Sequence, residues 1–572
     1  MKHVYQYLKP YIPRMSLGLT IKFLGTIMDL LLPWILSHMI DEVAPLKDVG
    51  LIVKWGLIML LCAVVAVITN VVANRMASWV ATQCTRKIRH DLFQKISYLS
   101  CAQVDYYTIP SLESRLTTDT YNVHNLISRM QRIGIRAPIL LLGGIIITLL
   151  LEPVLASVLL CVLPFLGILV FHVSKKGIPL YTHLQQGIDS MVRTVRENIT
   201  GIRVIKALSK TEHEQERFRE INAEVAARET TAGVTMSLTN PMMNLFLNLG
   251  LTIVILVGAY RVNAGLTETG KIIAFLTYFT IILNAMMSIT RMFVMMSRGT
   301  ASANRIAEIL DAPADLELAA SDDIESENHI EFDHVYFAYE KSRDQHISDI
   351  SFSLKRGESL GIIGATGSGK STIINLLMRL YDNDKGSIRI DGQLVSSIPD
   401  EELHRKFGLV FQNDVLFADT IAENISFGRD LSMEEIEEAA THAQAMEFIN
   451  SLPERFQHKL TSKGTNLSGG QKQRVLLSRA LAGNPEILIL DDSSSALDYK
   501  TDSLLRQALR EHYSNTTTVI IAQRISSIYH CDKILVLEEG RCIGYGSHEE
   551  LMQRCSVYQE ISQSQMGGMI HA

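Results

Sequence analysis

The sequence predicts a multi-domain chain in which an all-α domain of six transmembrane helices precedes an α/β domain with a phosphate-binding loop. Three observations carry this prediction. Apolar stretches of about 20 residues, the length that spans a bilayer, are confined to residues 1–307. Residues 308–328 are acidic and lack hydrophobic periodicity, as expected of a linker. Residues 329–572 contain a strand, a glycine-rich loop and a helix in direct succession.

The six apolar stretches define the expected membrane spans. The third and fourth are separated only by Leu151-Glu152-Pro153, which predicts a tight hairpin. Apolar residues make up 47% of the chain and charged residues 20%, which excludes a disordered, collagenous or coiled-coil protein. The expected spans cover about 15–40, 51–76, 133–151, 154–173, 241–262 and 272–296.

The segments between the spans predict the orientation. The links after the second and fourth spans are long and rich in Lys and Arg, whereas the links after the first, third and fifth are short. The positive-inside rule therefore places the long links and both termini in the cytoplasm, in a multi-pass protein of the cytoplasmic membrane. Residues 78–100 and 181–230 have helical spacing, so the spans should continue into the cytoplasm as helices that break at 106–111 and 200–201.

The few ionisable side chains inside these spans include Lys22, Asp29, Arg136, His172 and Arg291. A charge at membrane depth must face a partner or water, which makes each a functional candidate. The commoner interpretation of Arg136 and His172 is a side chain that reaches the interface near a span end. Asp29 is deeper, and a place in a polar cavity is one hypothesis for it.

The last two spans carry adaptable and polar side chains. Asn240, Asn244 and Asn248 recur every four residues and so share one helical face, where an unpaired amide in lipid would be costly. Methionines suit promiscuous binding surfaces, although plain packing is their commoner role. They are Met242, Met243, Met286, Met287, Met292, Met295 and Met296.

Net charge divides the chain in the same way as hydropathy. Residues 1–300 hold 29 Lys and Arg against 18 Asp and Glu, whereas residues 301–572 hold 25 against 42. The acidic second half disfavours a nucleic-acid partner, because duplex binding needs a basic surface. The 7 cysteines show no metal-ligand spacing, which indicates reduced thiols.

The glycine-rich loop of the second half has a specific chemistry. An apolar strand at 360–363 runs into Gly364-Ala365-Thr366-Gly367-Ser368-Gly369-Lys370-Ser371 and then into a helix that begins with Thr372. In this setting the pattern predicts a phosphate-binding loop, whose backbone N–H groups and helix N-terminus hold phosphates. Lys370 supplies a fixed cation, and the Ser371 hydroxyl is a ligand for Mg²⁺.

A second apolar strand, 488–490, ends in Asp491 and Asp492. A buried strand delivers the first carboxylate to the edge of the sheet at which the phosphate loop lies. The pattern is weak alone, but beside the phosphate loop it completes a site for a Mg²⁺ nucleotide.

Leu467-Ser468-Gly469-Gly470-Gln471 points to a family. Together with Tyr339, Gln412 and Asp498, this signature makes the second half resemble the nucleotide-binding domain of ABC transporters. The six spans, their cytoplasmic extensions and the segment 197–203 resemble the membrane domain of ABC exporters. The resemblance covers nearly the whole chain.

The resemblance implies a half-transporter that uses ATP and Mg²⁺ and works as a dimer. Tyr339 would stack on adenine, Gln412 would contact Mg²⁺, and Asp498 would cross the dimer interface. The signature would cap ATP held by the partner's phosphate loop, and residues near 106–113 and 203–212 would be coupling helices. The implied nucleotide contacts are Tyr339, Gly364, Thr366, Gly367, Ser368, Gly369, Lys370, Ser371, Thr372, Gln412, Leu467, Ser468, Gly469, Gly470 and Gln471, with Ser371, Gln412 and Asp491 as metal ligands.

Two catalytic positions depart from the family pattern. Asp492 stands where the family has the Glu that activates water, and Gln523 stands where it has the switch His. A misplaced base loses much of a contribution worth roughly 10²–10⁴-fold. Residues 461–464 also lack the usual acidic side chain. The expected catalytic residues are Asp492, Gln523 and Asp498. With its two departures, the chain resembles the degenerate-site subunit of a heterodimeric exporter.

The sequence therefore predicts ATP-driven export of small amphipathic molecules such as drugs, with a second half-transporter and membrane lipid as partners and no nucleic acid. One alternative is a homodimeric exporter of peptides or lipids, although Asp492 and Gln523 disfavour it. Another is a largely non-hydrolytic regulatory subunit. Sequence alone does not separate export from import on the same fold.

Overall fold

The computed structural model describes residues 2–314, 316–320, 323–339, 345–493 and 496–566. The chain divides into two compact units. The first comprises Met1–Ser97 and Pro110–Ala312 and is helical. The second comprises Tyr98–Ile109 and Pro313–Ala572 and holds both β-sheets.

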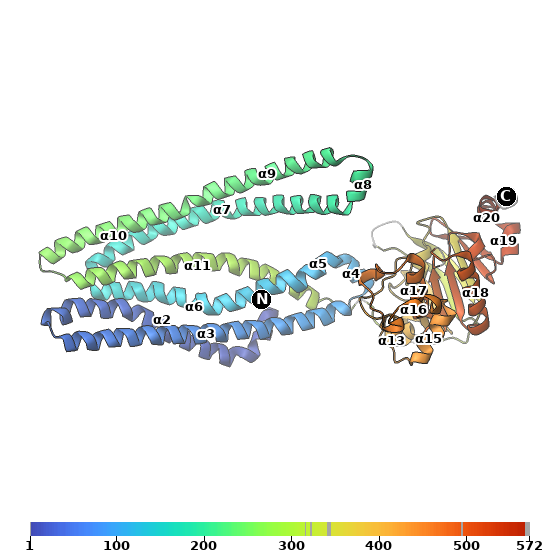
Figure 1. Ribbon diagram of the computed structural model, residues 1–572, viewed down its shortest axis with the longest axis horizontal. Helices are drawn as coiled ribbons and strands as arrows, with labels where there is room; N and C mark the ends of the chain where they lie inside the picture. Colours follow the sequence, from blue (N-terminus) through green and yellow to red (C-terminus); the bar gives the residue numbers. More distant parts are fainter. Residues whose placement is uncertain (1, 315, 321–322, 340–344, 494–495, 567–572) are drawn as a thin grey trace. The chain divides into compact units, whose positions relative to one another are not determined.

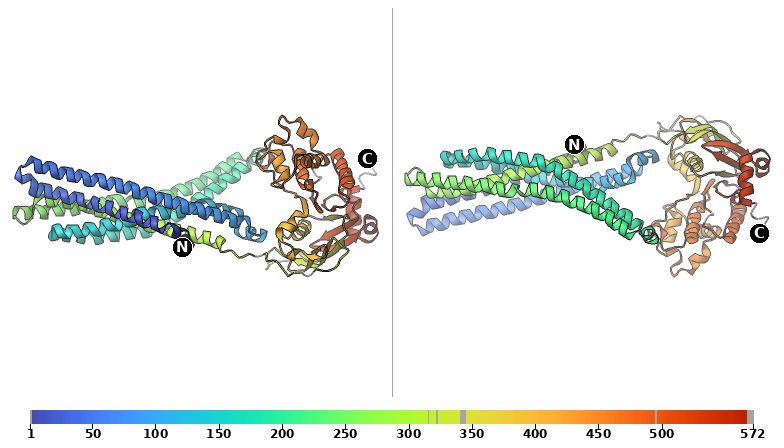
Figure 2. Two further views of the ribbon diagram at one scale, coloured as in Figure 1. Left: turned by 90° about the horizontal axis from the view of Figure 1, so that it is seen from below. Right: turned by 90° about the horizontal axis from the view of Figure 1, so that it is seen from above.

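The helical unit consists of long helices joined by short links. The long ones are α2 (Ile12–His38), α3 (Val49–Ser97), α6 (Thr120–Leu151), α7 (Pro153–Thr200), α9 (Thr211–Ser237), α10 (Thr239–Asn263) and α11 (Thr269–Leu310). The short ones are α1 (Lys2–Leu8), α5 (Ile109–Ser114) and α8 (Ile202–Ala207). Within this unit α2, α3, α6 and α11 pack together, while α9 and α10 run back along α7 (Figures 1 and 2).

The core of this unit is aromatic and aliphatic. Phe275, Tyr278, Phe279 and Ile282 lie fully buried on α11 and pack with Leu159 of α7. The Tyr278 hydroxyl donates a hydrogen bond to the carbonyl of Leu30, so its polar atom is satisfied at membrane depth. This packing fixes α11 against α2 and α7.

The described residues hold five helical segments long and apolar enough to cross a membrane: His3–Leu46, Val49–Ser97, Ile109–Leu151, Thr211–Asn263 and Thr269–Ile289. A shorter apolar helix, Pro153–Leu169, coincides with the fourth expected span. The hairpin before it turns at Glu152, whose carboxylate pairs with Arg261 at 3.0 Å. The structure thus confirms a helical membrane domain, with five long apolar segments where the sequence predicts six spans.

The cytoplasmic extensions are continuous helices, as their spacing predicts, but the first break lies earlier than expected. The helix α3 ends at Ser97, and a separate helix, α4 (Cys101–Tyr107), follows. The Ser100 hydroxyl caps α4 by accepting a hydrogen bond from the N–H of Gln103. The expected break at 106–111 corresponds to Thr108, which has a φ of 62° between α4 and α5. The second extension ends at Thr200, as predicted.

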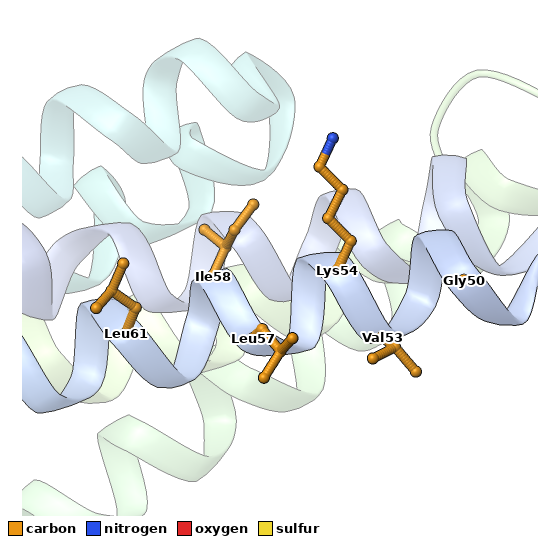
Figure 3. A pocket seen from close by; sticks show the side chains of 6 residues that line it. All are labelled: Gly50, Val53, Lys54, Leu57, Ile58 and Leu61. Carbon is orange, nitrogen blue, oxygen red and sulfur yellow. The ribbon is translucent and has the colours of Figure 1, made fainter.

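A shallow groove on α3 is lined by Gly50, Val53, Lys54, Leu57, Ile58 and Leu61. Figure 3 shows that all six belong to this one helix, with Lys54 and Ile58 projecting on one side and Val53 and Leu57 on the other. Apolar side chains without a facing element are typical of a lipid-facing helix surface. Lys54 lies near the span end, from which a long side chain reaches the interface.

The second unit contains two sheets among the described residues. One has the order β2-β1-β4-β5 and is antiparallel; the other has the order β10-β9-β3-β8-β7-β6, parallel except for β10. The strands are β1 (Ile330–Phe337), β2 (Ile347–Leu354), β3 (Ser359–Gly364), β4 (Lys385–Ile390), β5 (Gln393–Leu394), β6 (Phe407–Val410), β7 (Ile487–Asp491), β8 (Thr517–Ile521), β9 (Lys533–Glu538) and β10 (Arg541–Gly546).

Helices cover the parallel sheet and form a subdomain beside it. They are α12 (Lys370–Leu377), α13 (Asp400–Arg405), α14 (Ile421–Ser426), α15 (Met433–His442), α16 (Met446–Ser451), α17 (Gly469–Leu481), α18 (Tyr499–His512), α19 (His548–Arg554) and α20 (Ser556–Met566). One hydrophobic cluster joins α12 to both sheets, and a second joins α14 to α17 and to β7. The strand β7 is buried along its whole length, as expected for a central parallel strand.

Candidate functional site

Four neighbouring parallel strands, β3, β8, β7 and β6, end at the same edge of the sheet. The phosphate loop follows β3, Gln523 follows β8, Asp491 ends β7, and Gln412 follows β6. Because the carboxyl ends of parallel strands form the ligand-binding edge of such sheets, this topology gathers four motifs that are far apart in the sequence.

These motifs line one cavity of about 330 Å³. Its walls hold most of the phosphate loop, together with Gln412, both aspartates and Gln523. The lining residues are His346, Thr366, Gly367, Gly369, Lys370, Ser371, Thr372, Gln412, Asp491, Asp492, Ile521 and Gln523. Both departures from the family pattern, Asp492 and Gln523, therefore belong to the same site as the phosphate loop.

The phosphate loop is shaped by two glycines and carries the Lys370 ammonium against its backbone. Gly367 and Gly369 have φ values of 85° and 97°, which favour glycine. The Lys370 ammonium donates hydrogen bonds to the carbonyls of Gly364 and Ala365 at 2.9 and 2.8 Å. The buried Ser368 hydroxyl has no hydrogen-bond partner among the described residues. A cation beside an unpaired hydroxyl and a helix N-terminus suits a phosphate.

The metal-ligating residues expected at this edge do meet. The Ser371 hydroxyl donates a hydrogen bond to the carboxylate of Asp491 at 3.1 Å, and Gln412 lines the same cavity. Burial raises the pKa of Asp491, and the neighbouring Asp492 acts in the same direction, whereas the Ser371 hydrogen bond lowers it. Burial also lowers the pKa of Lys370, against the effect of both carboxylates. A hydroxyl, an amide and a carboxylate form an oxygen donor set that fits Mg²⁺.

The backbone around the two departing residues is fixed. Asp492 has a φ of 51°, and its N–H donates to the carbonyl of Ile521 at 3.0 Å. The side chain of Gln565 on α20 bridges the loop that holds Gln523. Its amide donates to the Gln523 carbonyl at 2.9 Å and accepts from the Ile525 N–H at 2.8 Å. The last described helix therefore holds this loop in place.

Two aromatic side chains, Tyr339 and His346, lie beside the phosphate loop, although the sequence predicts only Tyr339. Tyr339 does not line the cavity, but its hydroxyl donates to the hydroxyl of Thr372 at 3.2 Å. Its ring meets that of His346 edge-on at 5.1 Å. His346 lines the cavity and was not predicted from the sequence, because no motif marks its position in the segment before β2.

The signature lies outside this cavity. Ser468 caps α17, and a reciprocal bond from its N–H to the Gln471 side chain completes a capping box. A Cβ on Gly469 would meet nothing within 4 Å, whereas one on Gly470 would lie 3.2 Å from the carbonyl of Ala496. Leu467 is half-buried beneath them. Ser468 and Gly469 are thus exposed at the N-terminus of α17, whereas Gly470 and Gln471 are partly covered.

Asp498 also lies away from the cavity, at the N-cap of α18. Its carboxylate accepts hydrogen bonds from the N–H and the hydroxyl of Thr501, both at 2.9 Å. These bonds hold the pKa of Asp498 below its usual range. The structure therefore gives Asp498 a local capping function in this chain, and any contact across an interface would be additional.

The helix α4 belongs to the same unit as the nucleotide site. The Tyr381 hydroxyl donates to the carboxylate of Asp105 at 2.7 Å, and the Gln103 amide donates to the carbonyl of Pro313 at 2.7 Å. Tyr381 also meets the ring of Tyr339 edge-on at 5.1 Å. Contacts therefore run without a gap from the phosphate-loop helix through Tyr339 and Tyr381 to α4.

The structure also pairs ionisable groups of the membrane unit. Arg136 on α6 and Asp29 on α2 form an ion pair of 3.0 Å. The buried Lys22 ammonium donates to the side chains of Asn70 and Asn74 at 2.7 and 3.1 Å. His172 and Arg291 are exposed on α7 and α11.

The predicted asparagine face is exposed in part. Asn244 and Asn248 are exposed on α10, and Asn240 lies outside the side chains that the structure describes. Met243 is buried in the core, which supports a packing role for this methionine.

Comparison with known proteins agrees with this arrangement. Residues 15–286 match the ABC transporter transmembrane region, and residues 347–495 match the ABC transporter domain. YfiB of Bacillus subtilis, an uncharacterised ABC transporter ATP-binding protein, is 34% identical over 568 residues, or 99% of each chain. An ATP-dependent lipid A-core flippase of Legionella pneumophila is 28% identical over 573 residues, or 100% of this chain and 97% of the flippase. A bacterial Atm1-family ABC exporter solved with ATP bound matches with a TM-score of 0.81 and 24% identity, over 97% of this chain and 98% of that one.

The chain therefore belongs to the ABC transporters, and its fold is that of the exporter type. Its second unit is an ATP-binding domain whose hydrolysis of ATP drives transport. The helical unit spans the membrane, and the nucleotide-binding unit lies on the cytoplasmic side. Proteins of this type function as dimers.

Proposed function

We propose that this chain is one subunit of a heterodimeric ABC exporter that moves small amphipathic molecules, including drugs, out of the cell. Its own nucleotide site binds ATP but hydrolyses it slowly, and its signature completes the working site on the partner. The observation that carries this proposal is the placement of the two departures. Asp492 and Gln523 both line the phosphate-loop cavity, whereas the intact signature lies outside it.

The fixed backbone supports slow hydrolysis at this chain's own site. Because the Asp492 N–H is held by β8, the shorter side chain cannot advance by the methylene it lacks relative to Glu. Gln523 can donate a hydrogen bond from its amide but cannot carry a proton as an imidazole does. A displaced carboxylate and an amide that cannot carry a proton therefore both weaken the proton transfer that water activation requires.

The other residues of the site support retention of ATP. Lys370 and the N–H groups of residues 364–371 bind the phosphates, and Ser371, Gln412 and Asp491 supply the ligands for Mg²⁺. When bound, Mg²⁺ neutralises phosphate charge. The binding machinery is thus complete, and only the hydrolytic residues are altered.

The exposed signature supports a partner-dependent active site. The N-terminus of α17 lies outside the cavity, so it acts on a nucleotide held by another chain. A partner with intact Glu and His residues then provides the working site. We further propose six membrane spans per chain, with Pro153–Leu169 as part of the fourth. Residues 1–307 would form the membrane domain and residues 329–572 the nucleotide-binding domain, with both termini cytoplasmic.

A lipid substrate is the second candidate. The relative in Legionella pneumophila is named a lipid A-core flippase and aligns over the whole of this chain. A flippase of this kind fits a homodimer, whereas the altered pair at 492 and 523 favours two unlike subunits.

Assembly tests the proposal. We expect the chain purified alone to hydrolyse ATP at a small fraction of the rate of the complex that it forms with its partner, because the lone chain offers only altered sites. Steady-state phosphate release from both samples in nanodiscs measures this. Turnover by the lone chain equal to that of the complex would contradict the heterodimeric function.

Replacing Tyr381 with Phe is expected to uncouple the two units in part. The variant loses one hydrogen bond to a carboxylate, worth about 1.5–3 kcal/mol, which holds α4 within the nucleotide-binding unit. Burial and the Asp105 carboxylate raise the pKa of Tyr381 far above its usual range, so the hydroxyl stays a donor. We expect fewer substrate molecules transported per ATP hydrolysed in proteoliposomes.

Two variants of the acceptor control for this effect. Asp105→Ala removes the acceptor and should behave like Tyr381→Phe, whereas Asp105→Asn keeps an acceptor oxygen and should retain more coupling. If all three variants transport as many molecules per ATP as the wild type, this hydrogen bond does not transmit the signal.

A further inference from the structure

A groove of about 310 Å³ lies between α6 and α11 in the membrane unit. Its apolar walls include Ile133, Ala137 and Leu140 of α6 and Ile281 of α11, and its polar groups are Arg136, Asn284 and Ser288. Ala285 completes the lining. The two helices pack along each other, as Figure 1 shows, so the groove has two fixed walls.

Arginines continue this groove along both helices toward the cytoplasm. On α6, Arg129 and Arg132 precede Arg136 by seven and four residues, which places the three on one helical face. On α11, Arg291 follows Ser288 by three residues, and Arg298 follows by a further seven. All five side chains are exposed in the single chain.

Acidic residues do not balance these arginines. The sequence has no Asp or Glu from 120 to 151 or from 269 to 307, and the first acidic residue after the latter stretch is Glu308. Arg136 pairs with Asp29 at 3.0 Å. In the part of the chain that the structure describes, no ion pair is recorded for Arg129, Arg132, Arg291 or Arg298.

Exposed arginines at membrane depth cannot face hydrocarbon at low cost. An arginine in the middle of a span is costly even by insertion measurements. The expected spans include Arg136 and Arg291, and Arg132 lies at the edge of one. The groove must therefore face an aqueous pathway, where five guanidinium groups and one carboxylate leave a strongly positive surface.

We propose that this groove, called here the arginine groove, binds the anionic head of an amphipathic substrate. Guanidinium groups bind phosphate and carboxylate oxygens through paired hydrogen bonds, which a lysine cannot reproduce. The hydrocarbon part packs on Ile133, Ala137, Leu140 and Ile281. This inference rests on the proposed export function and narrows its substrates to amphipathic anions.

The test measures binding rather than hydrolysis, so that it stands apart from the proposed function. The transporter complex is placed in nanodiscs of phosphatidylcholine without nucleotide, and the affinity for dodecyl phosphate is measured by equilibrium dialysis below its micellar concentration. Dodecyltrimethylammonium matches the chain with a cationic head, and inorganic phosphate matches the head without a chain. We expect dodecyl phosphate to bind at least about tenfold more tightly than either. The cationic probe lacks the charge-assisted hydrogen bonds, each worth about 1.5–3 kcal/mol, and inorganic phosphate lacks the apolar chain that packs in the groove.

Variants locate the site. The double variant Arg132→Gln with Arg291→Gln should weaken dodecyl phosphate binding at least about tenfold, by the same energies. The corresponding double Lys variant keeps both positive charges but cannot form the paired hydrogen bonds. Its affinity for dodecyl phosphate should lie between those of the wild type and the double Gln variant. Lys54→Gln removes a membrane-edge cation from α3 and should leave the affinity unchanged. If the double Gln variant is unstable, Arg132→Gln alone is measured in its place.

Two results would overturn the proposal: equal binding of the cationic and anionic probes by the wild type, or undiminished binding by the Gln variants. A second set of nanodiscs containing phosphatidylglycerol separates the sources of the anion. If phosphatidylglycerol competes with dodecyl phosphate, the occupant is a membrane lipid. If it does not compete, the occupant is a soluble amphiphile. A wild-type complex that binds dodecyl phosphate but does not hydrolyse ATP would refute the proposed export function without refuting the arginine groove.

Discussion

Gly469→Asp in this chain is expected to reduce ATP hydrolysis by the assembled transporter at least about 100-fold, the size of effect that a misplacement of about 1 Å has at a reacting centre. The new carboxylate lies at the exposed N-terminus of α17, where it repels phosphate and blocks close approach. Within this chain it does no harm. A Cβ on Gly469 meets nothing within 4 Å, and an acidic side chain in the first turn of a helix is stabilising.

A matched control exists in the same unit. Met433 also occupies the first position of a helix behind a Ser capping box, in α15, and is 43% exposed. Met433→Asp therefore makes the same chemical change at the same kind of position, away from the signature. Its steady-state phosphate release should match the wild type. If it loses as much activity as Gly469→Asp, the effect comes from general damage.

Asp492→Asn provides the contrast within this chain. At a working site, loss of the general base costs roughly 10²–10⁴-fold, but here we expect a change within about twofold. The carboxylate of Asp492 is one methylene short of the position that the family's Glu carboxylate would reach. If Asp492→Asn is more damaging than Gly469→Asp, this chain's own cavity is the catalytic one and the assignment is inverted.

Lys370→Ala is expected to weaken ATP binding at this chain's own cavity at least about tenfold, because the phosphates lose charge-assisted hydrogen bonds worth about 1.5–3 kcal/mol. Total turnover should fall much less, since the working site of the proposed heterodimer uses the partner's lysine. The measurement pairs photolabelling of each chain by a photoreactive ATP analogue with phosphate release from the same sample.

Lys355→Ala is the matched control, because this exposed lysine lies outside the cavity and its ammonium pairs with the exposed carboxylate of Glu327. It should leave both labelling and turnover unchanged. If Lys370→Ala stops hydrolysis as completely as the corresponding change in the partner, the two sites are not functionally distinct.

The features of this chain that could be predicted from its sequence are those that depend on local pattern. Apolar periodicity predicts α3 and α11, and the phosphate loop and the strand before Asp491 meet as parallel-strand topology requires. Gln412 and Gln523 reach the same cavity because each follows a neighbouring strand.

The parts that sequence could not supply are contacts between distant segments. Gln565 bridges a loop 42 residues away through backbone groups, which leave no mark in a sequence. His346 reaches the cavity only because β2 passes beside the phosphate loop. The sequence places Asp29 and Arg136 inside membrane spans, but their pairing depends on how α2 packs on α6. The earlier break between Ser97 and Cys101 was not predicted, because Ser100, which caps α4, is a weak signal on its own.

The central claim is that ATP is hydrolysed at the partner's phosphate loop and not at this chain's own. Vanadate trapping of the wild-type complex with a photoreactive ATP analogue tests this directly, because only a site that hydrolyses the nucleotide retains it with vanadate. After trapping, washing and illumination, each subunit is separated and its label quantified. We predict that the label lies on the partner, while untrapped samples label both chains. A trapped label on the phosphate loop around Lys370 would contradict the account.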